Sequence, residues 1–444
     1  MRKIAMIGAG GSVFPVRLIY DILSFPALQD SDLWLHDISA EGAERTLACT
    51  RDMIEIHSLP TTATATTDRR AALDKADFVI CCFAVGGMDA YRSDIEIPRE
   101  YGIDQPVGDT LGPGGVFRGL RHVALMREIA ADMHELCPDA LMIQYANPMS
   151  ILCWATDLLG IKTVGLCHSV QHTSRMLAEQ IAIPYEDITF DCAGVNHTSW
   201  FTTFRRGGQD LIPVIHETLI RRQLEQELPP SDSDDPWTAY TGRNERVRTE
   251  LMRLTGYFHT ESSHHASEYW PWFRKNPETV LHYIDKRWDH YELYGKDWLA
   301  GLEKVVVEMS RHQGLTPGEE YAAYILDSIV TGRRRVIYGN VRNGGLIPNL
   351  AEDACVELAC SVDEHGVRPI RYGDLPAICA ALSNVHINVQ RLATQAALTG
   401  DKSLLYAAVS LDPLTGVHCT LPQVRDMVNR MLAAQSVWLP QFPG

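Results

Sequence analysis

Short apolar runs and longer amphipathic stretches alternate along the N-terminal third of the chain. The apolar runs predict strands at residues 3–7, 32–36, 78–85, 141–145 and 164–166. The stretches between them carry apolar residues at helical spacing and predict helices at residues 13–23, 41–57 and 118–136. This order of strand, helix and strand predicts an α/β fold in which a parallel sheet has helices on both faces. We expect a ligand crevice where the carboxyl ends of the strands meet.

The pattern becomes mixed after Leu166. Apolar residues at helical spacing predict helices at residues 302–309, 321–330, 375–398 and 424–432. The Pro-, Ser- and Asp-rich segment at residues 228–235 is expected to be a solvated loop within this region. The chain therefore divides into two predicted units, a doubly wound parallel sheet over residues 1–165 and a mixed α+β second lobe over residues 166–444.

Charge and composition exclude several kinds of partner. The 444 residues include 40 Lys and Arg against 56 Asp and Glu, which gives a net charge of −16. A nucleic acid or an anionic membrane would need an extended basic face, so neither is expected as the main partner. No apolar run approaches the roughly 18 residues of a membrane-spanning helix. The 11 cysteines form no short-spaced disulfide framework apart from the adjacent Cys81 and Cys82, so we expect reduced thiols and a cytoplasmic protein.

A glycine-rich turn follows the first predicted strand. Gly8, Gly10, Gly11 and Ser12 stand before the first predicted helix, where backbone amides at a helix N-terminus can bind a pyrophosphate. Asp37 closes the second strand, where its carboxylate would accept hydrogen bonds from a ribose and repel a 2′-phosphate. This arrangement predicts a Rossmann-like domain that binds NAD rather than NADP. The alternative is structural, with glycines that allow a tight turn and an aspartate that caps a helix or turn.

A thiol and two imidazoles stand where the sequence should border the crevice. Cys167 and His168 directly follow the predicted strand at residues 164–166, and His197 ends the segment Gly194-Val-Asn-His. A Cys and a His with open positions for substrate would suit a catalytic divalent ion. Single Cys and His residues are more often satisfied core residues, and this alternative stays open for Cys167 and His197.

A second glycine-rich segment, Gly-Asp-Thr-Leu-Gly-Pro-Gly-Gly, occupies residues 108–115. Glycines ahead of a predicted helix allow a ligand to come close to the backbone. A plain loop would use the same residues, so the pattern alone leaves both interpretations open.

Motifs along essentially the whole chain resemble those of one enzyme family. They are Gly-Ala-Gly near the start, Asp109-Thr-Leu-Gly-Pro-Gly-Gly115, Asn147-Pro148, Cys167-His168-Ser169-Val170, Val195-Asn196-His197, Thr260-Glu-Ser-Ser263 and Tyr338-Gly-Asn-Val-Arg342. In this combination the chain resembles the family 4 glycoside hydrolases, and most closely their bacterial α-galactosidase branch. The resemblance implies a glycosidase that depends on NAD and a divalent metal, Mn²⁺ in this family, and that forms a homodimer or homotetramer.

The resemblance also implies an unusual route of hydrolysis, outside the scheme of two carboxylates. In that route NAD⁺ takes a hydride from C3 of the sugar, and the resulting ketone acidifies the proton on C2. A base removes this proton, the aglycone is eliminated, water adds, and the hydride returns. The metal chelates the C2 and C3 oxygens and stabilises the enediolate.

Residue roles follow from the resemblance, motif by motif. It places Cys167 and His197 as metal ligands, His168 as the general acid, and Asn147 and Asp109 at the substrate. The base lies in a segment that aligns loosely with residues 261–269.

By this alignment the base falls on His265, with His264, Glu261 and Tyr269 as nearby candidates. The pKa of an imidazole suits proton transfer near pH 7.

Two departures from the family pattern leave the sugar open. His264 stands where an acidic residue is expected, and His172 where a glycine is expected. Together with Arg92 they would suit an anionic sugar, so an acidic glycoside such as an α-galacturonide is an alternative substrate for the same mechanism.

Two other classes of protein would share a dinucleotide lobe. An NAD-dependent 2-hydroxy-acid dehydrogenase also has a mixed second lobe, but it makes one NADH per turnover, whereas the glycosidase returns its hydride. A non-catalytic NAD-responsive binding protein would need no reactive centre of thiol and metal.

Overall fold

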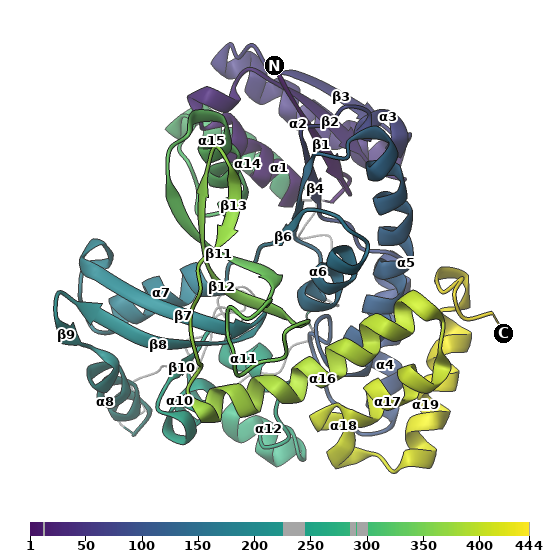
Figure 1. Ribbon diagram of the computed structural model, residues 1–444, viewed down its shortest axis with the longest axis vertical. Coiled ribbons are helices and arrows are strands. Elements are labelled where there is room, and N and C mark those ends of the chain that lie inside the picture. Colours follow the sequence, from purple (N-terminus) through teal and green to yellow (C-terminus); the bar gives the residue numbers. More distant parts are fainter. Residues whose placement is uncertain (12–13, 225–244, 285–289, 291–300, 444) are drawn as a thin grey trace.

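The computed structural model of the protein describes residues 1–11, 14–224, 245–284, 290 and 301–443 (Figure 1). Two of the sequence-based expectations lie outside these residues, namely Ser12 of the first glycine-rich turn and the loop at residues 228–235. None of the helices that the described residues form combines the length and the apolar character that crossing a membrane requires.

One sheet passes through the whole molecule, with the strand order β10-β8-β7-β12-β11-β6-β5-β4-β1-β2-β3. Its N-terminal half consists of β1 (Arg2–Ile7), β2 (Ser31–His36), β3 (Thr62–Thr66), β4 (Phe78–Cys81), β5 (Leu141–Gln144) and β6 (Thr163–Gly165). These strands are parallel, and their order 3-2-1-4-5-6 is that of doubly wound dinucleotide-binding domains. The predicted Rossmann-like parallel sheet is therefore confirmed.

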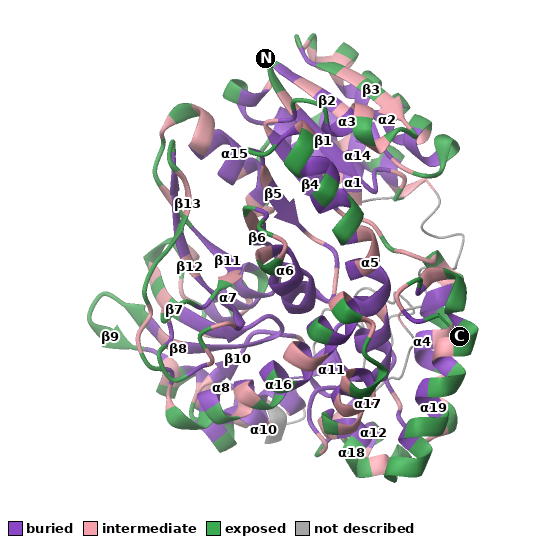
Figure 2. Cartoon of the chain, turned by 45° about the vertical axis from the view of Figure 1, so that its right-hand side comes forward, coloured by how far each residue is buried: buried purple, intermediate pink, exposed green. Residues whose placement is uncertain are grey.

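Helices cover both faces of the parallel strands. They are α1 (Phe14–Leu23), α2 (Ala40–His57), α3 (Arg69–Leu73), α4 (Gly87–Glu100), α5 (Gly112–Leu136) and α6 (Met149–Leu158). Alternate residues of β1 point to opposite faces. Ile4 and Met6 join the apolar core of α1 and α2, whereas Ala5 and Ile7 join that of α3 and α5. The strands inside the sheet are accordingly mostly buried, the edge strand β3 is not, and the exposed residues gather on the outer sides of the helices (Figure 2).

Antiparallel strands continue the sheet beyond β6. They are β7 (Ile188–Val195), β8 (Thr198–Arg206), β9 (Gln209–Asp210), β10 (Phe258–His259), β11 (Arg335–Arg342), β12 (Cys355–Asp363) and β13 (Gly366–Pro369). Asn340 of β11 pairs with Gly165 of β6 and joins the two halves. The helices of this lobe are α7 (Ser169–Gln180), α8 (Ile212–Leu224), α10 (Arg246–Thr255), α11 (Ser263–Ala266) and α12 (Pro277–Tyr283). The mixed α+β character is confirmed, while the division at residues 165 and 166 stays a prediction because the sheet is continuous there.

Segments from the second half of the chain pack back on the first half. Helix α14 (Leu302–Gln313) lies against α1 and α2, and α15 (Tyr321–Thr331) lies against α1. Val306 and Ile325 of these helices belong to the same apolar core as Ile4 and Met6.

Four C-terminal helices lie beside α4, α5 and α6 (Figure 1). They are α16 (Ala377–Thr399), α17 (Lys402–Leu411), α18 (Pro413–His418) and α19 (Leu421–Ala434). Short 3-10 helices span Pro26–Leu28, Tyr185–Asp187 and Ser436–Trp438.

The strand predicted at residues 78–85 is shorter in the structure. β4 ends at Cys81 because the chain turns at Gly86 and Gly87, whose backbones adopt left-handed conformations with φ of 80° and 51°, and then enters α4. Cys81 and Cys82 form no disulfide, and all 11 cysteines are free thiols, as expected.

Candidate active site

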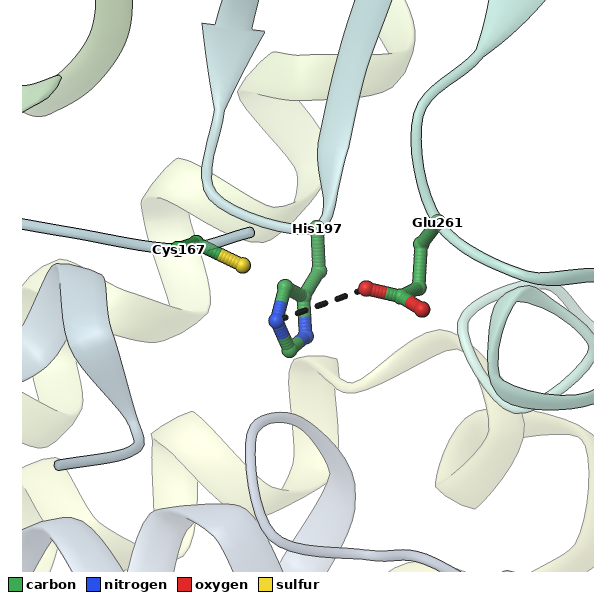
Figure 3. Close-up of side chains that lie close together, drawn as sticks. All are labelled: Cys167, His197 and Glu261. Atoms are coloured by element: carbon green, nitrogen blue, oxygen red, sulfur yellow. Dashed lines mark ion pairs between the residues drawn. The ribbon is translucent and has the colours of Figure 1, made fainter. Parts of the chain in front are cut away.

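Three side chains of metal-binding type come together at the carboxyl end of the parallel strands (Figure 3). Cys167 follows β6, His197 stands in the turn between β7 and β8, and Glu261 follows β10. One ligand atom of each lies within 4.8 Å of the others. The three residues come from segments that are far apart in the sequence. The fold brings them together, and no short spacing in the sequence predicts the cluster.

The backbone presents His197 at the tip of a two-residue turn. Its φ of 62° lies in the left-handed region, which is uncommon for a residue with a Cβ atom and is often found at functional sites. His197 Nδ1 lies 2.8 Å from the Tyr269 hydroxyl, and its Nε2 lies 3.5 Å from Glu261 Oε2. With Nδ1 held by Tyr269, Nε2 faces the cluster, as in metal-binding imidazoles.

The charged groups of the cluster stabilise one another's ionised forms. Burial raises the pKa of Glu261, but His197 and His265 more than offset this effect and lower that pKa to about 2. Burial lowers the pKa of His197, but Glu261 and the Cys167 sulfur raise it to about 10. A proton on His197 is thus held by two acidic groups, and a divalent cation would replace that proton.

The donor set of this cluster fits a metal ion. A thiolate, an imidazole and a carboxylate form a mixed set that suits a divalent transition metal and leaves coordination positions open for substrate oxygens. From the sequence, Glu261 is a candidate base and is not indicated as a metal ligand. Its place beside Cys167 and His197 follows from the pairing of β10 with β8, which no pattern in the sequence indicates.

His265 of α11 lies next to the metal candidates. Its Nε2 is 3.5 Å from Asp109 Oδ1, and its Nδ1 is 3.9 Å from Glu261 Oε1. Burial lowers the pKa of His265 to about 4, although Glu261 and Asp109 oppose this shift. The imidazole is therefore neutral near pH 7, with two carboxylates in place to stabilise it once it accepts a proton.

Asp109 and Asn147 meet beside His265. Asn147 Nδ2 donates a hydrogen bond of 3.0 Å to Asp109 Oδ2, and the Thr110 hydroxyl donates one of 2.7 Å to Oδ1. Burial opposes ionisation of Asp109, but His265 and Arg118 hold its pKa well below the ordinary value. Arg118 Nε in turn donates to the Asn147 carbonyl at 3.2 Å. The structure thus joins Asp109, Asn147 and His265 in one polar group.

His168 and His172 lie at the start of α7, with ring centroids 4.9 Å apart. His168 Nδ1 is 3.9 Å from a carboxylate oxygen of Glu320, and His172 Nε2 is 3.4 Å from one of Glu319. The His168 side chain is 48% exposed although its neighbour Cys167 belongs to the metal cluster. It is therefore accessible to a substrate that enters from solvent.

The other two residues predicted to bind the substrate, Arg92 and His264, are not part of the polar group around His265. Arg92 of α4 is 58% exposed, and its Nε lies 3.9 Å from Glu96 Oε1. The described contacts do not connect Arg92 to the group around His265. His264 is buried, and burial together with Arg274 holds its pKa well below the ordinary value, so its imidazole is uncharged.

The turn after β1 forms a backbone cradle. Gly8 has a φ of 96°, and a Cβ on it would lie 2.6 Å from a backbone nitrogen; a Cβ on Gly10 would lie 2.6 Å from Asp37 Cγ. Asp37 accepts hydrogen bonds from the Gly10 and Ser39 amides at 2.8 and 2.9 Å. Each carboxylate oxygen keeps a lone pair for a ribose hydroxyl. With Gly11 exposed, this cradle fits a dinucleotide, and Asp37 also holds the turn together.

The glycines of the segment at residues 108–115 pack against the protein itself. Helix α5 begins at Gly112, before the predicted start at residue 118. A Cβ on Gly114 would lie 2.7 Å from the Asp94 carbonyl oxygen, and a Cβ on Gly115 would lie 2.4 Å from the Thr110 carbonyl carbon. These glycines therefore serve close backbone packing, which leaves Asp109 as the residue of this segment that faces His265.

Known proteins resemble this chain over its full length. Residues 3–183 match the family described as Family 4 glycosyl hydrolase, and residues 192–415 match its C-terminal domain. An alpha-galactosidase from Rhizobium meliloti is 37% identical over 99% of this chain and 89% of its own length. An alpha-galactosidase from Bacillus subtilis is 33% identical over 100% of both chains. An alpha-galacturonidase from Lachnoclostridium phytofermentans is 31% identical over 99% of this chain and 97% of its own length.

Solved structures share the fold. The protein lplD from Bacillus subtilis has a TM-score of 0.84 and 28% identity over 97% of this chain and 100% of its own. A 6-phospho-alpha-glucosidase from gut microorganisms, solved in complex with NAD and Mn²⁺, has a TM-score of 0.79 and 19% identity over 100% of both chains. The second likeness concerns the fold alone.

Proposed function

Because the chain belongs to family 4 of the glycosyl hydrolases, we propose that it hydrolyses α-galactosides with NAD⁺ and a divalent metal, Mn²⁺, as cofactors. The observation that carries this proposal is the convergence of Cys167, His197 and Glu261 beside His265. The two alpha-galactosidase relatives support the substrate, and the metal-type donor set and the backbone cradle after β1 support the cofactors. We also expect a cytoplasmic enzyme that forms a homodimer or homotetramer.

The chain's own residues bind the sugar and move protons. When bound, NAD⁺ supplies reversible oxidation at C3 of the sugar, and the metal polarises the oxygens on C2 and C3. His265 accepts the C2 proton on an imidazole nitrogen, while Asp109 stabilises the protonated ring. His168 donates a proton to the glycosidic oxygen as the aglycone leaves, and Asn147 binds a sugar hydroxyl.

The cradle after β1 holds the dinucleotide in this proposal. Gly8 and Gly10 let the turn pack closely against the protein, the exposed Gly11 leaves the turn open to the pyrophosphate, and Asp37 binds the adenosine ribose. Asp37→Asn is expected to weaken NAD⁺ binding by roughly 1–3 kcal/mol, because a charge-assisted hydrogen bond is lost. Calorimetric titration of NAD⁺ into the metal-loaded protein measures the effect, and thermal unfolding without NAD⁺ shows how far the turn itself is weakened.

Asp32→Asn is the matched control for this experiment. Asp32 lies near the start of β2, the strand that Asp37 follows, and its carboxylate accepts hydrogen bonds from Trp34 Nε1 and from the Thr62 hydroxyl of the edge strand β3. If Asp37→Asn binds NAD⁺ as tightly as Asp32→Asn does, Asp37 does not bind the ribose.

The charges around the cluster favour a neutral sugar. His168 and His172 each face a glutamate, and Arg118 is engaged by the Asn147 carbonyl and the face of the Tyr91 ring. A sugar carboxylate here would meet further carboxylates and no free cation among the residues described around His265. Burying such an unpaired charge is strongly unfavourable.

A direct comparison of substrates tests the proposed function. With NAD⁺, Mn²⁺ and reductant, we expect kcat/KM for a chromogenic α-galactoside to exceed that for the α-galacturonide by roughly 100-fold or more, since the acidic sugar lacks a partner for its charge. The alpha-galacturonidase relative makes the acidic glycoside the second candidate. A preference for the galacturonide would refute the neutral sugar, and one NADH formed per turnover would instead indicate a dehydrogenase.

A further inference from the structure

A row of four paired residues crosses the sheet just before the metal candidates. Gly165 of β6 pairs with Asn340 of β11, Asn340 pairs with Glu357 of β12, and Glu357 pairs with Gly194 of β7. Strand β6 leads to Cys167, and β7 leads into the turn that carries His197. The row therefore links the two strands that deliver the thiol and the imidazole.

The Glu357 carboxylate reinforces this link through its side-chain hydrogen bonds. Its Oε2 accepts from the Ser199 hydroxyl at 2.7 Å, and its Oε1 accepts from Asn340 Nδ2 at 3.2 Å. Asn340 Nδ2 also lies 3.3 Å from the Gly165 carbonyl oxygen. One carboxylate thus ties the β7–β8 hairpin to the end of β6.

Glu357 forms no ion pair with another residue in the part of the chain that the structure describes. The residue is 1% exposed, and its hydrogen-bond donors Ser199 and Asn340 are neutral. A buried carboxylate without a compensating cation is costly. Burial raises the pKa of Glu357, although Ser199 and His197 oppose the shift. A divalent ion at Cys167 and His197 would replace the His197 proton and bring a larger positive charge to the same end of the sheet.

We propose that Glu357 is a positioning residue for the metal centre. Its carboxylate keeps β6 and the β7–β8 turn at the spacing that Cys167 and His197 need, and its negative charge strengthens the binding of a divalent cation. This inference rests on the metal site of the proposed function and assigns a role to a residue outside the ligand set.

Direct binding of Mn²⁺ to Glu357→Gln tests the proposal. The glutamine keeps the shape of the side chain and one acceptor oxygen but removes the charge. We expect Mn²⁺ titrated into the metal-free protein to bind roughly 10- to 100-fold more weakly than to wild type. The Tm of the metal-free protein should stay the same or rise, because a neutral amide is easier to bury. A purely structural role predicts the opposite result, a lower Tm with unchanged Mn²⁺ affinity, and would overturn the proposal.

Two further variants keep this test decisive. Asp412→Asn is the matched control, since Asp412 is also a buried carboxylate with neutral donors, the amide and hydroxyl of Thr415 at 2.8 Å, and lies between α17 and α18. It should leave Mn²⁺ affinity unchanged. Ser199→Ala removes one tie to Glu357 and should weaken Mn²⁺ binding less than Glu357→Gln does. If Glu357→Gln does not fold, wild-type affinity in Ser199→Ala overturns the proposal.

Failure of the metal site itself gives a different result. If Cys167→Ser binds Mn²⁺ as tightly as wild type, Cys167 is not a ligand and the metal site is not the one proposed above. If Cys167→Ser loses Mn²⁺ while Glu357→Gln retains it, only the role of Glu357 is refuted.

Discussion

Cys167→Ser is expected to abolish Mn²⁺ binding at micromolar metal and to lower kcat/KM for the α-galactoside by about 1,000-fold, the factor that corresponds to about 4 kcal/mol of lost transition-state stabilisation. A serine hydroxyl is a poor ligand for a divalent transition metal, whereas the thiolate is anionic and polarisable. Metal content by mass spectrometry and steady-state kinetics measure the two effects.

Stability should change little in this variant, because Cys167 is only half-buried and its 3.4 Å contact with the Ser169 hydroxyl is one that a serine can also form. Cys419→Ser is the matched control, since Cys419 is also a half-buried free thiol, bonded to the Tyr101 carbonyl in the C-terminal helical region. It should retain metal and rate. Full metal content and rate in Cys167→Ser would remove this residue from the site.

His265→Ala is expected to lower kcat by roughly 100- to 10,000-fold, the contribution usual for a general base. The variant should also lose the exchange of the sugar C2 proton with deuterated solvent, which NMR follows independently of turnover. Because removal of the buried His265 side chain leaves a space of the size of an imidazole, added imidazole should restore part of both signals.

The same variant distinguishes the candidate bases. His418→Asn serves as the control. His418 lies on α18, and its Nε2 forms a hydrogen bond of 3.0 Å with the Arg274 carbonyl oxygen. It should keep both rate and exchange. If C2 exchange persists in His265→Ala, the base is another of the candidate residues. Tyr269 is then the next residue to substitute, since its hydroxyl lies 2.8 Å from His197 Nδ1.

The sequence predicted the parallel half of the sheet because its signals are local. In β1 the buried residues Ile4 to Ile7 read as one apolar run, and the glycines and Asp37 lie where a strand meets a helix. Ends of elements were less predictable. Residues 82–85 continue the apolar run after β4, yet the backbone turns of Gly86 and Gly87 take the chain out of the sheet.

The antiparallel half depends on contacts between distant segments. Asn340 pairs with a residue 175 positions earlier, and no periodicity in either segment indicates its partner. For the same reason the sequence found Cys167 and His197 through their motifs but did not place Glu261 beside them.

The roles of Arg92 and His264 at the substrate stay predictions. Arg92 and His264 were selected as possible partners of an anion. In the structure Arg92 is paired on an exposed helix and His264 is buried and uncharged. The sequence shows which side chains can ionise. Burial and neighbouring groups set their pKa values and therefore decide whether they are charged.

Helices α14 and α15 pack on the N-terminal lobe although they are synthesised much later. The lobe that is made first is therefore not the first to be completed. Helix α14 packs against α1 and α2, α15 packs against α1, and both helices share the apolar core of α1 and α2. While the ribosome is still making the middle of the chain, the apolar surface of α1 and α2 that these helices cover stays exposed, and a nascent polypeptide in this state is open to aggregation and to capture by chaperones. The dinucleotide lobe, although encoded first, reaches its closed form only after residues 302–331 have emerged, so its maturation waits for sequence that belongs to the other half of the enzyme.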